Sequence, residues 1–116
     1  MNDDAQSRQT VTPPRVCGIA ESQKNFSDYQ SIAFPARPPE FFALELAGEC
    51  GELANLEKKI WRDPSRTDCL QELGGEAADI FIALVNYCNA RNIDLEAEVS
   101  QKLLKIELRR VQGLMG

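Results

Sequence analysis

Apolar residues recur with a helical period along most of the chain, and polar residues fill the positions between them. This pattern predicts four helices. We expect the first over residues 21–34, the second over 39–61, the third from residue 67 to a turn at 92–94, and the fourth from there to residue 111. The predicted fold class is therefore all-α.

The two ends of the chain lack this period. Residues 1–20 are polar and contain a Thr-Pro-Pro sequence, so we expect a disordered or loosely attached arm. Residues 21–111 form the predicted all-α domain, and residues 112–116 are expected to fray. A chain of 116 residues is long enough for one such domain with a modest core.

Individual residues favour the helix ends. Pro39 suits the first turn of the second helix, because its missing N–H would have no intrahelical partner there. Asp63 and Pro64 end that helix. Thr67 and Asp94 are predicted N-caps of the third and fourth helices, since their side-chain oxygens can accept hydrogen bonds from free backbone N–H groups.

Two features of the central helices predict contacts on more than one side. Residues 80–85 of the third helix are all apolar, and a helix that is apolar all round is buried on several faces. Four short helices offer few partners, so we expect a second subunit there. Gly48 and Gly51, followed by Gly74 and Gly75, weaken their helices, which predicts close approach of a neighbouring helix or a ligand.

The same two helices each carry a pair of carboxylates. Glu49 and Glu52 lie three residues apart, as do Glu76 and Asp79, so each pair shares one helix face. Glu45 extends the first pair into an acidic stripe. A plain solvated acidic face is the alternative interpretation, but apolar residues flank both pairs.

Four clustered carboxylates repel one another, and burial raises their pKa values unless a cation joins them. Two antiparallel helices can converge four such oxygen ligands on one point. Oxygen ligands favour Mg²⁺, with Mn²⁺ as a substitute. The chain has no histidine, which excludes the ligand set of the di-iron bundles.

Composition restricts the partners. The net charge of −5 argues against a nucleic-acid duplex, which needs a basic surface. The most apolar stretch, residues 77–88, is too short to span a bilayer, so no membrane partner is expected. The start of the chain lacks the features of a signal peptide, and four isolated cysteines favour free thiols, which together predict a cytoplasmic protein.

The two carboxylate pairs also carry a family resemblance. The sequences GECGEL at 48–53 and GEAADI at 75–80, with this spacing, resemble the MazG-like nucleotide pyrophosphohydrolases over residues 22–110. The resemblance implies a four-helix MazG-like bundle, a homodimer or homotetramer with helices contributed across the subunit interface, and Mg²⁺-dependent hydrolysis of a nucleoside triphosphate to the monophosphate and pyrophosphate. It implies a metal-ligand set of Glu49, Glu52, Glu76 and Asp79.

Further roles follow from the same resemblance. One of the carboxylates Glu49, Glu52 and Glu45 would orient the attacking water. Lys102 and Arg109 match basic positions of the family's last helix and would hold phosphate oxygens. Asn86 follows Asp79 by seven residues on the same face and is a further candidate for substrate binding.

Some side chains allow two interpretations. Lys59 is either a phosphate ligand or a surface charge. Phe26, Tyr29 and Trp61 either stack on a base or pack in the core or an interface. No residue pattern indicates which base is bound.

The chain departs from the family pattern at two positions. Gly48 stands where the family often has a glutamate, and Ile106 stands where its last helix has an asparagine. Both departures bear on substrate choice and rate. The alternatives are a catalytically silent helical module that binds a nucleotide or a protein, and a relative of the phosphoribosyl-ATP pyrophosphohydrolases.

Overall fold

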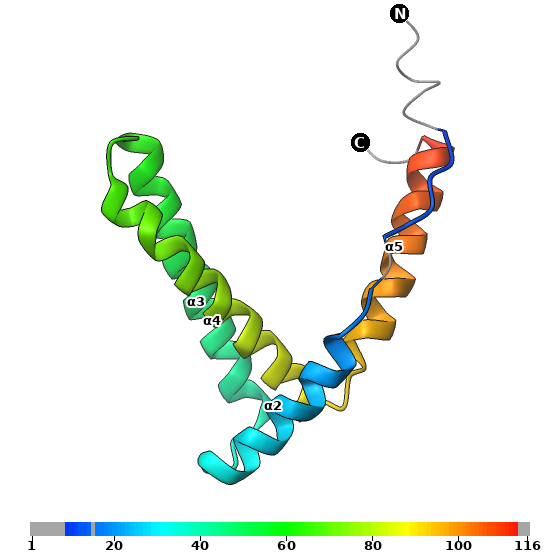
Figure 1. Cartoon of the computed structure of the whole chain (residues 1–116), viewed down its shortest axis with the longest axis horizontal. Helices are drawn as coiled ribbons and strands as arrows, with labels where there is room; N and C mark the ends of the chain where they lie inside the picture. Colours follow the sequence, from blue (N-terminus) through cyan, green and yellow to red (C-terminus); the bar gives the residue numbers. More distant parts are fainter. Residues whose placement is uncertain (1–8, 15, 114–116) are drawn as a thin grey trace, which may run out of the picture. The chain divides into compact units, whose positions relative to one another are not determined.

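The computed structural model describes residues 9–14 and 16–113, and all regular secondary structure in these ranges is helical. The helices are α2 (Ile19–Ala33), α3 (Pro39–Arg62), α4 (Thr67–Ala90) and α5 (Leu95–Gln112) (Figure 1). The prediction of an all-α chain with four helices is therefore confirmed over this part. Residues 1–8 and 15 of the predicted arm, and 114–116 of the predicted tail, lie outside the described residues. No helix that the structure describes has both the length and the hydropathy needed to cross a membrane.

The helix ends follow the local sequence with one exception. Pro39 is the first residue of α3, and the Asp94 carboxylate accepts a hydrogen bond from the Ala97 N–H at the start of α5. The prediction that Thr67 caps the third helix is wrong, because Thr67 is its first residue and Arg66 occupies the cap position. Asp63 accepts hydrogen bonds from the backbone N–H and the hydroxyl of Ser65, which closes the preceding turn and lets α4 begin one residue earlier.

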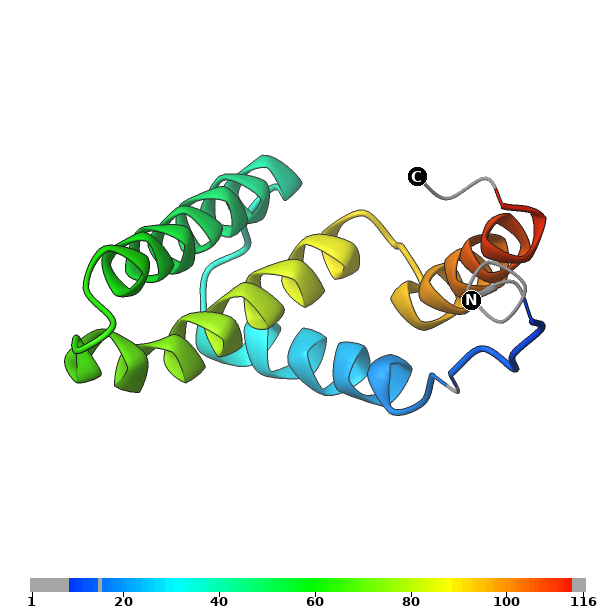
Figure 2. The same cartoon turned by 90° about the horizontal axis from the view of Figure 1, so that it is seen from above.

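The chain divides into two compact units, and Ser22–Ile93 forms the larger. In this unit α3 and α4 pack side by side as an antiparallel hairpin (Figure 2). The core consists of Phe42 and Leu56 from α3 with Cys69, Ala83, Val85 and Cys88 from α4. Residues 22–33 of α2 contact α4 where the Phe26 and Phe81 rings meet edge to face at 6.1 Å, and where Gln23 and Asn89 form hydrogen bonds with each other.

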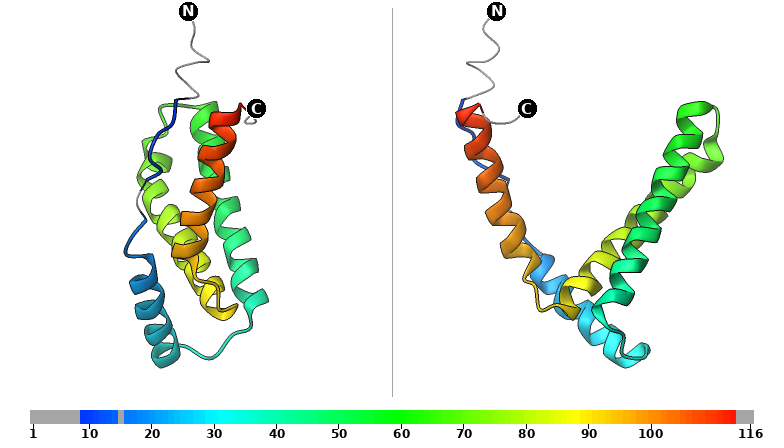
Figure 3. Two further views of the ribbon diagram at one scale, coloured as in Figure 1. Left: turned by 90° about the vertical axis from the view of Figure 1, so that its right-hand side faces the viewer. Right: turned by 180° about the vertical axis from the view of Figure 1, so that it is seen from behind.

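The smaller unit combines Met1–Glu21 with Asp94–Gly116. Its described arm residues run along α5 (Figure 3). The Val11 N–H donates to Glu107 at 3.1 Å, and Arg110 donates to the Gln9 carbonyl. Glu96, in the first turn of α5, accepts hydrogen bonds from the N–H groups of Ile19 and Ala20 and so caps the start of α2. The described arm residues therefore contact α5 through specific hydrogen bonds.

The central hairpin leaves apolar surface and all four glycines open. Phe81 and Ile82 of α4 are 40% and 45% exposed, and Leu44 of α3 is 74% exposed. No atom beyond the local helix lies within 4 Å of a Cβ built on the glycines at positions 48, 51, 74 and 75. The described chain therefore supplies no close neighbour at these glycines, and the predicted approach of a neighbouring helix or a ligand stays a prediction.

Candidate metal centre

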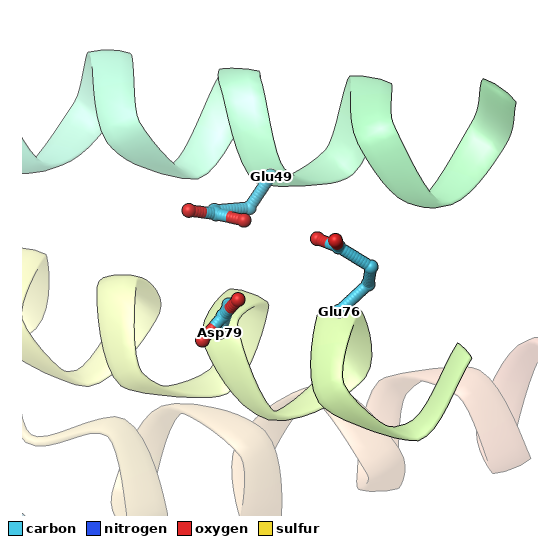
Figure 4. Close-up of side chains that lie close together, drawn as sticks. All are labelled: Glu49, Glu76 and Asp79. Atoms are coloured by element: carbon cyan, nitrogen blue, oxygen red, sulfur yellow. The ribbon is translucent and has the colours of Figure 1, made fainter. Parts of the chain in front are cut away.

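Three predicted metal ligands converge between α3 and α4. Glu49 projects from α3 toward Glu76 and Asp79, which are three residues apart on one face of α4 (Figure 4). One carboxylate oxygen from each residue lies within 4.8 Å of the other two. The antiparallel packing of the hairpin thus brings the two carboxylate pairs together, although they are separated by the whole α3–α4 turn. We call these three residues the acidic cluster.

Two oxygens of the acidic cluster lack a protein partner. The Oε2 atoms of Glu49 and Glu76 are buried and accept no hydrogen bond from the residues that the structure describes. A buried polar atom without a partner destabilises the fold, and a buried charge does so more strongly. A cation bound between the helices would satisfy both oxygens, so the residues present fit a metal site.

The donor atoms favour a hard divalent cation. All are carboxylate oxygens, which Mg²⁺ and Ca²⁺ prefer. Oxygens on opposite sides of Mg²⁺ are about 4 Å apart, and those around Ca²⁺ up to about 5 Å apart. The limit of 4.8 Å between the oxygens of the acidic cluster is close to both spans. Small rotations of three side chains would therefore bring one oxygen of each to a single cation, whose remaining ligands would be water or phosphate oxygens.

The pKa values of the acidic cluster also reflect the burial of its carboxylates and their mutual repulsion. Burial raises the pKa of Glu76 to about 7, with further contributions from the nearby carboxylates of Glu52 and then Glu49. Burial also raises the pKa of Glu49, as do the charges of Glu52 and Asp79. Without a cation, the folded protein therefore favours a proton on this group of carboxylates near neutral pH.

The fourth predicted ligand, Glu52, is exposed on α3, as Asp79 is on α4, and it lies close enough to Glu76 to raise its pKa through hydrogen bonding and through its charge. Glu45 is exposed one turn before Glu49, and Lys59 is exposed near the end of α3. Asn86 is buried in α4. Lys102 and Arg109 are exposed on α5, in the smaller unit. The structure therefore brings three of the four predicted ligands together, and the roles of the other residues stay predictions.

Sequence reasoning missed a pocket in the larger unit. It has a volume of about 400 Å³, and aromatic residues on both sides of the Pro35–Pro39 break line it, among them Phe34 and Phe41. Glu45 and Asn86 line it as well. Phe26 and Tyr29, for which the sequence allowed either stacking on a base or packing, also line it. The proline-rich break beside them indicates only a turn by itself, so no sequence signal indicated the pocket as a whole.

The raised pKa of Glu76 leads to a testable pH dependence. In the metal-free protein, the folded state binds more protons than the unfolded state between the ordinary pKa of 4.5 and the folded value of about 7. The free energy of unfolding should therefore fall as pH rises through this interval. Melting temperatures in EDTA from pH 4.5 to 8 measure it. Glu76→Gln should show a flatter dependence, and an identical slope in both proteins would contradict the assignment.

The chain matches no protein-family model, no curated protein and no solved structure with which it was compared.

Proposed function

We propose that this chain is a Mg²⁺-dependent nucleotide pyrophosphohydrolase of the MazG-like kind, which converts a nucleoside triphosphate to the monophosphate and pyrophosphate. The observation that carries the proposal is the acidic cluster of Glu49, Glu76 and Asp79, with its two buried and unpartnered oxygens. The resemblance of the two carboxylate sequences to that family supports it as well.

The acidic cluster alone would repel a triphosphate, so the proposal requires a cation there. Bound Mg²⁺ supplies a Lewis acid for phosphate oxygens and lowers the pKa of a bound water. Glu49, Glu76 and Asp79 would hold it, with Glu52 next to them as the fourth predicted ligand. Their negative charges would then be offset by the cation, and the phosphates could approach.

The protein residues have separate tasks in the reaction. Water adds to the α-phosphorus, and the bond to the bridging oxygen breaks as pyrophosphate leaves. A carboxylate that accepts the water proton must lie beside the cluster. Glu45 meets this requirement on α3, because it precedes Glu49 by one helical turn and is exposed to solvent. Lys59, Lys102 and Arg109 are the cations that we assign to the phosphates.

The proposal includes self-association as a homodimer or homotetramer with a MazG-like bundle formed across the subunit interface. The open apolar surface of the hairpin supports it, since Leu44, Phe81 and Ile82 are exposed in the single chain. It also includes a cytoplasmic location. The four cysteines, which are all free thiols, fit a reducing compartment.

A substrate panel tests the proposed function. Canonical and modified nucleoside triphosphates and phosphoribosyl-ATP are incubated with the protein and Mg²⁺, and pyrophosphate release is measured. We expect release from at least one compound, and its loss in EDTA. Release from phosphoribosyl-ATP alone would favour the related enzyme class. Binding of a nucleotide without any release would instead favour the silent module, which Gly48 and Ile106 support.

A further inference from the structure

The aromatic pocket lies within the larger unit, between α2, the break after it, α3 and α4. Its volume is about 400 Å³, which lies in the range of small-molecule sites. Four aromatic rings line it, together with two polar side chains that matter below: Phe26, Tyr29, Phe34, Phe41, Glu45 and Asn86. A pocket with apolar walls and a few polar groups is the usual form of a site for a small organic ligand.

The aromatic walls remain accessible to a ligand. Tyr29 is 62% exposed and Phe34 is 49% exposed, and their rings meet edge to face at 5.6 Å. The Arg37 guanidinium lies 4.8 Å from the centroid of the Phe41 ring. Exposed aromatic rings around a hollow offer stacking surfaces, which favour a planar ring as the occupant.

Asn86 adds a polar group to the wall of the pocket. It is only 8% exposed, and it lines the pocket. A carboxamide has two donors and an acceptor. A ligand that presents both donors and acceptors at one edge would form hydrogen bonds with this side chain.

The pocket and the acidic cluster lie along the same two helices. Glu45 precedes Glu49 by four residues on α3, whereas Asn86 follows Asp79 by seven residues on α4. Because α3 and α4 are antiparallel, both displacements point toward the same end of the hairpin. At a rise of 1.5 Å per residue, Glu45 lies about 6 Å from Glu49 along α3, and Asn86 lies about 10 Å from Asp79 along α4. A sugar and its first phosphate lie between a base and the reacting anhydride, so one nucleotide can reach both places.

We propose that this pocket binds the base of the nucleotide, and that Asn86 recognises its polar edge. The inference rests on the proposed function for the identity of the ligand. The rings of Tyr29 and Phe34 stack with the base, and the Asn86 carboxamide forms hydrogen bonds with its amino or keto group. Because rotation of the carboxamide by about 180° exchanges its oxygen and its nitrogen, wild-type Asn86 can bind either an amino or a keto group. Asn86 is thus a specificity-determining residue and takes no part in the chemistry.

Two pairs of uncharged nucleosides test this role without catalysis or metal. Cytidine and uridine differ in an amino or keto group at position 4, and adenosine and inosine differ in the same way at position 6. Binding is measured by calorimetry in EDTA at pH 8. Asn86→Asp leaves a side chain with hydrogen-bond acceptors only. It should therefore weaken the binding of uridine and inosine relative to that of cytidine and adenosine by about tenfold. If Asn86 had only a structural role, the substitution would weaken the binding of all four nucleosides equally.

Two further variants keep the test decisive if Asn86→Asp does not fold. Tyr29 is exposed, so Tyr29→Ala should fold. It should weaken the binding of every nucleoside that the wild type binds by about tenfold, without altering the preference between amino and keto groups. Asn25→Asp makes the same substitution at an exposed position of α2 outside the pocket, and should change nothing.

Absence of nucleoside binding in the wild type would overturn the inference, as would an unchanged affinity in Tyr29→Ala. An equal effect of Asn86→Asp on all four nucleosides would also overturn it. These outcomes are separate from the substrate panel. Selective binding without pyrophosphate release would reject the proposed hydrolysis and retain the pocket, whereas release with failed binding tests would reject the pocket alone.

Discussion

Glu49→Gln and Asp79→Asn are each expected to reduce pyrophosphate release by about a thousandfold while leaving the helical content unchanged. Each substitution keeps the shape of the side chain but removes a negative charge from the acidic cluster. A bound metal supplies several kcal/mol of transition-state stabilisation, and each 1.36 kcal/mol corresponds to a factor of ten in rate. Initial rates are measured at saturating substrate and Mg²⁺, with circular dichroism as the check on folding.

Glu57→Gln is the matched control for this experiment. It removes a carboxylate from the same helix at an exposed position outside the acidic cluster. We expect it to retain wild-type activity. Activity in Asp79→Asn equal to that of the wild type would show that the assigned ligands are wrong. Equal losses in Glu57→Gln and Glu49→Gln would instead indicate a general charge effect.

Mg²⁺ is expected to raise the melting temperature of the wild type by several degrees. A ligand that binds only the folded state stabilises it by about 2.7 kcal/mol at a hundredfold excess over its dissociation constant. A free-energy change of this size shifts the melting temperature of a small domain by several degrees or more. Burial and the neighbouring carboxylates raise the pKa of Glu76 to about 7, which shows that its charged form is unfavourable in the metal-free protein. A bound cation would stabilise that charged form.

Glu76→Gln separates binding from screening in the same experiment. It should melt at a higher temperature than the wild type without metal at pH 8, because it removes one repelling charge, and it should lose most of the response to Mg²⁺. Na⁺ at equal ionic strength only screens charges and should produce a smaller shift. A full Mg²⁺ response in Glu76→Gln, or equal shifts from both salts in the wild type, would contradict a metal site at the acidic cluster.

Local sequence determined the helices and the composition of their faces. The apolar period predicted four helices, and α3 and α5 begin and end within one or two residues of the predicted bounds, because proline, aspartate and helix periodicity act within a few residues. The spacing of Glu76 and Asp79 likewise placed them on one face of α4 without any tertiary information. The prediction that Thr67 caps α4 was wrong, because the Asp63 carboxylate closes the preceding turn first and Arg66 takes the cap position.

Tertiary structure decided which carboxylates meet. The sequence predicted four equivalent ligands, and the packing of α3 on α4 brings oxygens of Glu49, Glu76 and Asp79 within 4.8 Å of one another, with Glu52 next to them on α3. That choice depends on how the hairpin is rotated and aligned, which contacts far apart in sequence determine. The aromatic pocket depends on them entirely. Phe34 and Asn86 are separated along the chain by α3 and most of α4, and only folding places the carboxamide in one pocket with those rings.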